Sequence, residues 1–103
     1  MAEIVSIAIF DALPGAEDEA LATMRGLRAL MAEKKYSRDR LYRDRHSQRH
    51  FLFRYWTSAG ARREAHEDPQ VHAFWIRLSE LIQIQTVYEE LDDITEPAAA
   101  QGA

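Results

Sequence analysis

The segment 50–56, HFLFRYW, constrains the fold more than any other part of the chain. It is rich in aromatic residues, which favour strands, and successive side chains of a strand point to opposite faces of its sheet. One alternating set is Phe51, Phe53 and Tyr55, and the other contains Leu52 and Trp56. Both sets are apolar. We therefore predict a strand whose sheet needs cover on both faces.

The first third of the chain predicts a strand followed by a helix. Residues 3–10, EIVSIAIF, are apolar in both alternating sets, and Leu13-Pro14-Gly15 ends the strand. Residues 16–35 follow with acidic residues at the start and two lysines at the end, as the helix dipole favours. Gly26 interrupts this helix, and we expect it to permit close packing on the sheet. The predicted core positions of the helix are Ala20, Met24, Leu27 and Met31.

The second third predicts a hairpin. Residues 38–46 carry Leu41 and Tyr42 among charged residues, and the short link 47–49 joins them to the aromatic strand. Residues 38–50 contain five Arg against two Asp. We interpret this alternation as a solvated or dimer-edge strand with cross-strand ion pairs.

The last third predicts a broken helix and a final strand. Thr57 or Ser58 caps a short helix over 59–66, and Asp68-Pro69 opens the next helix. Residues 83–91 form the last strand. The predicted apolar stripe of the second part of the helix consists of Val71, Phe74, Trp75, Leu78, Leu81 and Ile82.

This element order predicts an α+β domain of ferredoxin-like βαββαβ topology, with a four-stranded antiparallel sheet and helices on one face. The other face is also apolar, so we predict a homodimer through the open sheet face. A monomer with a half-polar open face is the alternative. The domain spans 1–94, and the small, polar residues 95–103 form a flexible tail.

The composition excludes several classes of function. No cysteine is present, so disulfides, thiolate nucleophiles and Cys-based metal sites are absent, which fits a cytoplasmic location. Glu3 stands where a signal peptide would be positive, and no apolar run reaches the roughly 18 residues of a membrane span. His46 and His50 flank the hairpin turn, but no metal-ligand spacing is present. We expect no metal and no membrane partner.

RNA binding is a separate alternative, because the RNA-recognition motif has the same βαββαβ order and stacks bases on exposed strand aromatics. However, the glycines of its RNP1 pattern are absent from 49–55, and the net charge is −4. We therefore expect no nucleic-acid partner.

The stretch 52–78, LFRYWTSAGARREAHEDPQVHAFWIRL, resembles the antibiotic biosynthesis monooxygenase (ABM) superfamily of dimeric α/β barrels. In that family the third strand ends in an aromatic residue before a Trp/Tyr-x-Ser-type cap. A short helix ending in His follows, and then a Pro-opened helix with an aromatic step. The matching positions are Tyr55-Trp56-Thr57-Ser58, Ala65-His66, Pro69 and Ala73-Phe74. The resemblance extends over residues 3–92 and implies that two sheets close into one barrel.

The resemblance also implies a function. The family includes cofactor-free oxygenases of anthrone- or quinol-like polyphenols, so it implies a cofactor-independent monooxygenase with a small aromatic substrate. Haem-degrading members use an Asn on the first strand, a Trp where this chain has His66 and a His near Ile76. All three are missing here, so haem cleavage is not expected.

Such an oxygenase needs a base, an oxyanion donor and an apolar pocket. His66 matches the family's helix-end His and is the first candidate base, and His72 is the second. Trp56 and Tyr55 are predicted to line a flat aromatic pocket. Arg54 or Tyr42 is predicted to bind a phenolate oxygen.

A purely structural role is the alternative for each of these residues. His66 can act as a C-terminal helix cap, His72 as a surface residue, and Trp56 and Trp75 as core or interface aromatics. The alternative for the whole chain is a non-catalytic dimer of the same fold that binds a small ligand or acts as an accessory protein.

Overall fold

The computed structural model describes residues 4–97, which form one antiparallel four-stranded sheet with three helices. The chain order is β1 (Ile4–Ala12), α1 (Glu17–Glu33), β2 (Ser37–Arg43), β3 (His50–Trp56), α2 (Ala59–Glu67), α3 (Pro69–Leu78) and β4 (Ile82–Leu91). The strands lie in the order β2-β3-β1-β4. This arrangement confirms the α+β, ferredoxin-like βαββαβ prediction, with its second helix divided in two.

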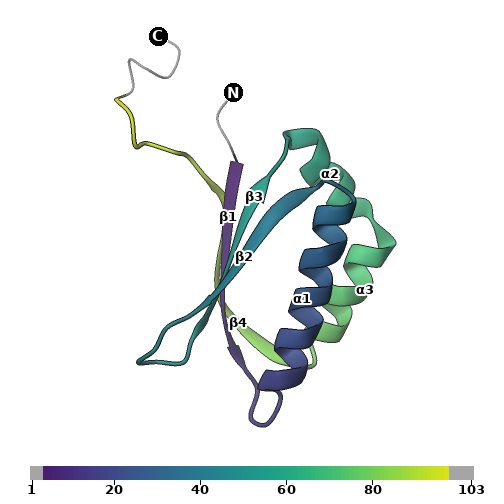
Figure 1. Cartoon of the computed structure of the whole chain (residues 1–103), viewed down its shortest axis with the longest axis vertical. Coiled ribbons are helices and arrows are strands. Elements are labelled where there is room, and N and C mark those ends of the chain that lie inside the picture. The colour runs from purple at the N-terminus through teal and green to yellow at the C-terminus, as the bar shows by residue number, and fades with distance from the viewer. Residues whose placement is uncertain (1–3, 98–103) are drawn as a thin grey trace.

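All three helices lie on one side of the sheet, as Figure 1 shows. The core fills the space between the two layers and is built from the predicted residues of α1 and the inward sets of β1 and β3. Its buried apolar members are Phe10, Ala20, Met24, Leu27, Met31, Tyr36, Leu52, Trp56, Ala65, Val71, Leu78, Leu81 and Ile82.

The strand registers confirm the two apolar faces predicted from alternation. Phe10, Leu52 and Trp56 are buried against the helices. The other set of β1 and β3 lies on the opposite face, where Ile7 pairs with Phe53 and Val5 with Tyr55. These side chains are only half-buried, and no helix covers them. We call this surface the open face; its large apolar and aromatic members are Val5, Ile7, Ile9, Tyr42, Phe51, Phe53, Tyr55 and Tyr88.

The predicted helix signals act at the predicted places. Gly15 turns the chain with a φ of 77°, a conformation that glycine adopts without strain. The Ser58 side chain accepts from the N–H of Ala61 at the start of α2. The Asp68 side chain accepts from the N–H of Gln70 at the start of α3, directly before Pro69.

The structure differs from the sequence expectation in several details. The strand β2 spans Ser37–Arg43 and so ends before the expected residue 46. The helix α1 ends at Glu33, so Lys34 is its C-cap rather than part of its last turn. Leu81 and Ile82 are buried but lie beyond α3, because that helix ends at Leu78 and Ile82 already begins β4. Gly26 approaches α3 and not the sheet, since a Cβ there would lie 2.8 Å from Cε1 of Phe74.

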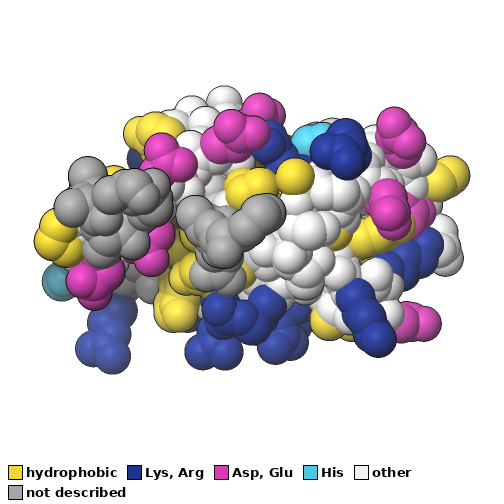
Figure 2. Space-filling view, turned by 90° about the horizontal axis from the view of Figure 1, so that it is seen from above, with side chains coloured by type: hydrophobic (Ala, Val, Ile, Leu, Met, Phe, Trp, Pro, Cys, Tyr) yellow, Lys and Arg dark blue, Asp and Glu magenta, His cyan; other side chains and the backbone are white. Residues whose placement is uncertain are grey.

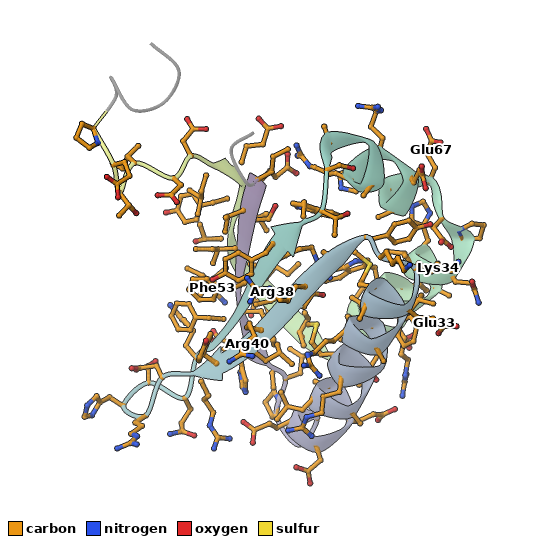
Figure 3. All side chains as sticks on the ribbon, turned by 45° about the horizontal axis from the view of Figure 1, so that its top comes forward. Glu33, Lys34, Arg38, Arg40, Phe53 and Glu67 are labelled. Carbon is orange, nitrogen blue, oxygen red and sulfur yellow. The ribbon has the colours of Figure 1, made fainter. Side chains whose placement is uncertain are left out.

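A buried carboxylate joins three elements at one end of the helical layer. Asp68 Oδ2 accepts from Tyr36 Oη at 2.7 Å and from Lys34 Nζ at 2.6 Å. Figure 3 labels Lys34 where the end of α1 approaches the helices α2 and α3. These bonds lower the pKa of Asp68 to about 2, with Lys34 the largest cause, and raise the pKa of Tyr36 to about 12.

The predicted C-terminal tail is described only in part. The strand β4 ends at Leu91, and residues 92–97 form no helix or strand. The rest of the predicted tail, 98–103, lies outside the described residues.

Candidate functional site

A cavity of about 400 Å³ lies between the sheet and the helices α2 and α3. Its size falls within the range of small-molecule sites. Most of its walls are apolar, with a few polar groups among them. Its lining residues are Ser6, Ile7, Ala8, Leu52, Arg54, Trp56, Arg62, Ala65, His66, Val71, His72, Trp75, Ile84, Val87 and Glu89. Ile84 and Val87 are 46% and 48% exposed, so the cavity is accessible along β4.

Arg54 is the buried cation of the cavity wall. It sits on β3 directly opposite Asp39 of β2, and its Nε and Nη2 donate to the two carboxylate oxygens at 3.0 and 2.8 Å. Asp39 also accepts from Ser37 Oγ at 2.7 Å. The sequence predicted cross-strand ion pairs here, but this pair is buried rather than solvated. The two bonds orient the guanidinium, and no hydrogen bond within residues 4–97 engages its Nη1.

Two tryptophans flank this guanidinium. The Arg54 Cζ lies 5.4 Å from the ring centroid of Trp56 and 5.9 Å from that of Trp75. Trp56 Nε1 donates to Ser6 Oγ at 2.8 Å, and Ser6 Oγ donates to the Glu89 carbonyl at 2.6 Å. The indole of Trp56 is thereby fixed by a hydrogen bond on one side and a cation–π contact on the other.

His66 and His72 line the same cavity from α2 and α3, so the structure brings together both predicted bases. The His66 ring meets Trp56 edge to face, with centroids 5.9 Å apart. The His72 Nε2 bonds to the backbone carbonyl of His66. A carbonyl oxygen only accepts, so Nε2 carries the proton of the neutral ring and Nδ1 keeps its lone pair. Both side chains are exposed.

The structure separates the remaining two predicted residues from this group. Tyr55 follows Arg54 on β3 and therefore lies on the open face, where the Arg38 guanidinium covers its ring at 4.4 Å. Tyr42 also lies there, edge to face with Phe53 at 5.5 Å. Neither lines the cavity that contains Trp56. Figure 3 labels Phe53 of β3 together with Arg38 and Arg40 of β2.

Sequence reasoning missed Ser6, Asp39 and Arg62 as parts of the site. Ser6 is the one polar residue within the apolar run 4–10, which is a usable signal for a polar role. The role of Asp39 follows from its register with Arg54, which the sequence alone does not indicate. Arg62 forms ion pairs with Glu89 and Glu90 at the cavity mouth, and nothing in its sequence context indicates this.

Within residues 4–97, no group of three or more His, Asp or Glu side chains is arranged to hold a metal ion. No helix in the same range is long and apolar enough to cross a membrane.

Known proteins provide a structural comparison. No family model matches the sequence, and no curated protein matches it. Among solved structures, a cofactor-independent oxygenase of Streptomyces nogalater, SnoaB, superposes with a TM-score of 0.76 at 20% identity, over 93% of this chain and 100% of its own. A putative antibiotic biosynthesis monooxygenase of Chloroflexus aurantiacus gives a TM-score of 0.74 at 15% identity, over 91% and 95%.

A third structure has no assigned function. It is a conserved protein of Bacteroides thetaiotaomicron described as a possible oxidoreductase, with a TM-score of 0.75 at 10% identity, over 85% of this chain and 97% of its own. At these identities the likeness concerns the fold. The chain therefore has the fold of the ABM-type proteins.

Proposed function

We propose that this chain is a cofactor-independent monooxygenase that oxidises a small quinol- or anthrone-like aromatic substrate in the cavity between α2–α3 and the sheet. The observation that carries the proposal is one cavity with two histidines, an oriented arginine and two tryptophans. SnoaB, described as a cofactor-independent oxygenase, has the same fold.

The base is His66, with His72 as the second candidate. No hydrogen bond within residues 4–97 engages the His66 ring nitrogens, so either can take a proton from a phenol or an acidic methylene. Trp56 backs the His66 ring and restricts its position. His72 presents Nδ1 as its basic atom because Nε2 is committed to the His66 carbonyl.

The oxyanion donor is Arg54. Deprotonation places negative charge on a substrate oxygen, and a preoriented cation in an apolar wall stabilises such charge strongly. Asp39 holds the guanidinium from behind through Nε and Nη2, so Nη1 is the group that faces a new acceptor. The indoles of Trp56 and Trp75 offer flat surfaces for an aromatic ring.

The reaction is balanced with molecular oxygen alone. For an anthrone-like substrate, the base removes a proton from the methylene carbon, and the resulting anion reacts with O₂ at that carbon. The O–O bond then breaks. One oxygen atom stays as the new carbonyl, and the other leaves as water with the two methylene hydrogens.

The proposal includes a homodimer formed through the open face. Eight large apolar or aromatic side chains gather there, and Tyr42 and Tyr88 are 52% and 51% exposed. A soluble chain rarely leaves a patch of this kind uncovered. A second copy offers the same surface, which is the commonest way to cover it. The absence of cysteine fits the proposed cytoplasmic location.

The deciding experiment follows oxygen uptake with simple quinols and anthrones, in air and under anaerobic conditions. Wild type should consume one O₂ per substrate, and His66→Ala should lower kcat by about 100-fold, the lower range for loss of a general base. His46→Ala removes a histidine from the hairpin, outside the cavity, and should leave the rate unchanged.

Other outcomes decide against parts of the proposal. Equal turnover after His66→Ala, with loss after His72→Ala, assigns the base to His72. Equal turnover in both variants would show that neither histidine acts as the base. Saturable binding of the same aromatics without oxygen uptake would identify a non-catalytic ligand-binding protein.

A further inference from the structure

A second concave site lies at the β2 edge of the sheet, between α1 and this edge strand. It is a groove of about 500 Å³ that shares no lining residue with the cavity described above. Its lining residues are Leu21, Arg25, Arg28, Arg40, Leu41, Tyr42, Arg43 and His50. Four of these eight are arginines, in a chain whose net charge is −4.

Most of this positive charge is unpaired. Arg43 forms an ion pair with Glu17 across the groove end, with Nη1 to Oε1 at 3.1 Å. Arg28 donates through Nε to the backbone carbonyl of Asp39 at 3.0 Å, which leaves its charge without a carboxylate partner. Within residues 4–97, Arg25 and Arg40 make no ion pair. Figure 2 shows several Lys and Arg side chains gathered along one long side of the molecule.

His50 provides an independent observation that favours a ligand in this groove. It lines the groove from β3, is 3% exposed and stacks on Phe10 with centroids 5.2 Å apart. Neither of its ring nitrogens makes a hydrogen bond, although Nε2 lies 3.2 Å from a Glu17 oxygen. Among the residues described, Nδ1 is therefore a buried side-chain atom with neither a hydrogen bond nor an ion pair, whereas Nε2 has the Glu17 carboxylate beside it. Buried polar atoms without partners are rare and indicate an additional group.

The backbone of the edge strand β2 offers a further hydrogen-bond donor to the groove. The Asp39 carbonyl faces outward, because it accepts from Arg28 on α1. The backbone groups of a strand residue point to the same side, and alternate residues share that side. Leu41 therefore directs its N–H to the groove, where β2 has no neighbouring strand.

We propose that this groove binds a small ligand through a phosphate group. The guanidiniums of Arg25 and Arg28 on α1 and of Arg40 on β2 line the groove without carboxylate partners. Three such cations match the three terminal oxygens of a phosphate monoester better than the two oxygens of a carboxylate. The His50 imidazole adds a further polar atom to the lining of the groove through Nδ1. A ligand of this size fits a concave groove, whereas a long nucleic-acid strand needs an extended surface.

The test measures binding of phenyl phosphate and inorganic phosphate by calorimetry, at constant ionic strength set with NaCl. Saturable one-site binding is expected, together with a change in the ring ¹⁵N chemical shifts of His50. Arg25→Gln and Arg40→Gln should each weaken binding about five-fold, which corresponds to the upper range for one exposed ion pair. Neither residue makes an ion pair whose loss would unfold the protein.

Arg63→Gln is the matched control, since Arg63 is an exposed arginine of α2 outside both sites. It should bind phosphate as wild type does. Equal weakening in all three variants, or no saturation, would overturn the proposal. So would succinate binding as tightly as phenyl phosphate, or binding that appears only with a single-stranded oligonucleotide.

Discussion

Arg54 and Asp39 face each other across β3 and β2 with two parallel hydrogen bonds, and both side chains are more than nine-tenths buried. The pair connects the fold to the site, because the same guanidinium forms part of the cavity wall. Removing one partner of a buried ion pair leaves the other charge uncompensated, which destabilises by about 3–5 kcal/mol.

The pair therefore predicts a strongly non-additive mutant cycle. Arg54→Met or Asp39→Leu alone should each lower the free energy of unfolding by about 3–5 kcal/mol. The double variant Asp39→Leu/Arg54→Met should lose much less than the sum, because it leaves no buried charge. Urea unfolding followed by circular dichroism measures all four proteins. Additive losses would show that the two side chains do not stabilise each other.

The effect of Gly26→Ala on stability depends on the neighbouring ring of Phe74. Alanine usually stabilises a helix by about 1 kcal/mol over glycine. Here its Cβ would meet the Phe74 ring at 2.8 Å, and overpacking costs about 1–3 kcal/mol. We expect Gly26→Ala to lower stability by about 1 kcal/mol net.

Two controls separate crowding from helix propensity. Gly60→Ala in α2 meets nothing closer than 3.7 Å and should stabilise. Gly26→Ala in a Phe74→Ala background should also stabilise, since the clashing ring is gone. If Gly26→Ala stabilises the wild-type chain as well, the two helices have room that the structure does not indicate. Thermal unfolding of these variants measures the differences in stability.

Asp68 predicts a loss of stability in acid. Its pKa is lowered to about 2 by the hydrogen bonds from Lys34 and then Tyr36, whereas its usual value is 3.8. A depressed carboxyl pKa contributes stability that is complete above pH 4 and is lost as the pH falls toward 2. Asp68→Asn should reduce the slope of stability against pH in that window, as measured by urea unfolding at pH 2–5. An unchanged slope would contradict the assignment.

Tyr36 predicts a loss of stability in alkaline solution. Its pKa is raised to about 12, first by its hydrogen bond to Asp68 and then by burial. The folded state keeps the phenol proton between pH 10 and 12, so stability falls as the pH rises through that window. Tyr36→Phe should flatten this part of the curve. Tyr42, a tyrosine on the open face without a bond to a carboxylate, provides the control variant Tyr42→Phe.

The open face predicts a dimer that charge can dissociate. Wild type should be a dimer at micromolar concentration by light scattering. Phe53→Glu/Tyr88→Glu places charge on the open face and should give a folded monomer. Ile76→Glu changes a residue of α3 that is 67% exposed, and it should remain a dimer. A monomeric wild type would remove the dimer from the proposal.

The fold could be predicted from sequence because its signals are local. The alternation in 4–10 and 50–56 defines two apolar faces, and Ser58 and Asp68-Pro69 mark the helix starts. The end of α3 was harder to predict, because Leu81 and Ile82 continue the apolar spacing of the helix into the next strand. The contact of Gly26 with Phe74 depends on how the helices pack, which spacing does not contain.

The site could be predicted only in part. His66, His72, Arg54 and Trp56 do line one cavity, but Tyr55 does not, although it precedes Trp56 directly. Neighbours along a strand point to opposite faces, which separates the side chain of Tyr55 from those of Arg54 and Trp56. Ser6 and Asp39 become site residues through strand pairing, which joins segments 48 and 15 positions apart from Arg54.

The alternation of β3 has a consequence for how this protein can change over evolutionary time. Leu52, Arg54 and Trp56 face the cavity, while Phe51, Phe53 and Tyr55 face the other way. Substitutions at one set can therefore reshape the cavity while the open face is inherited intact. A single-residue insertion in this strand has the reverse effect, because it would exchange the two sets and change both surfaces in one step.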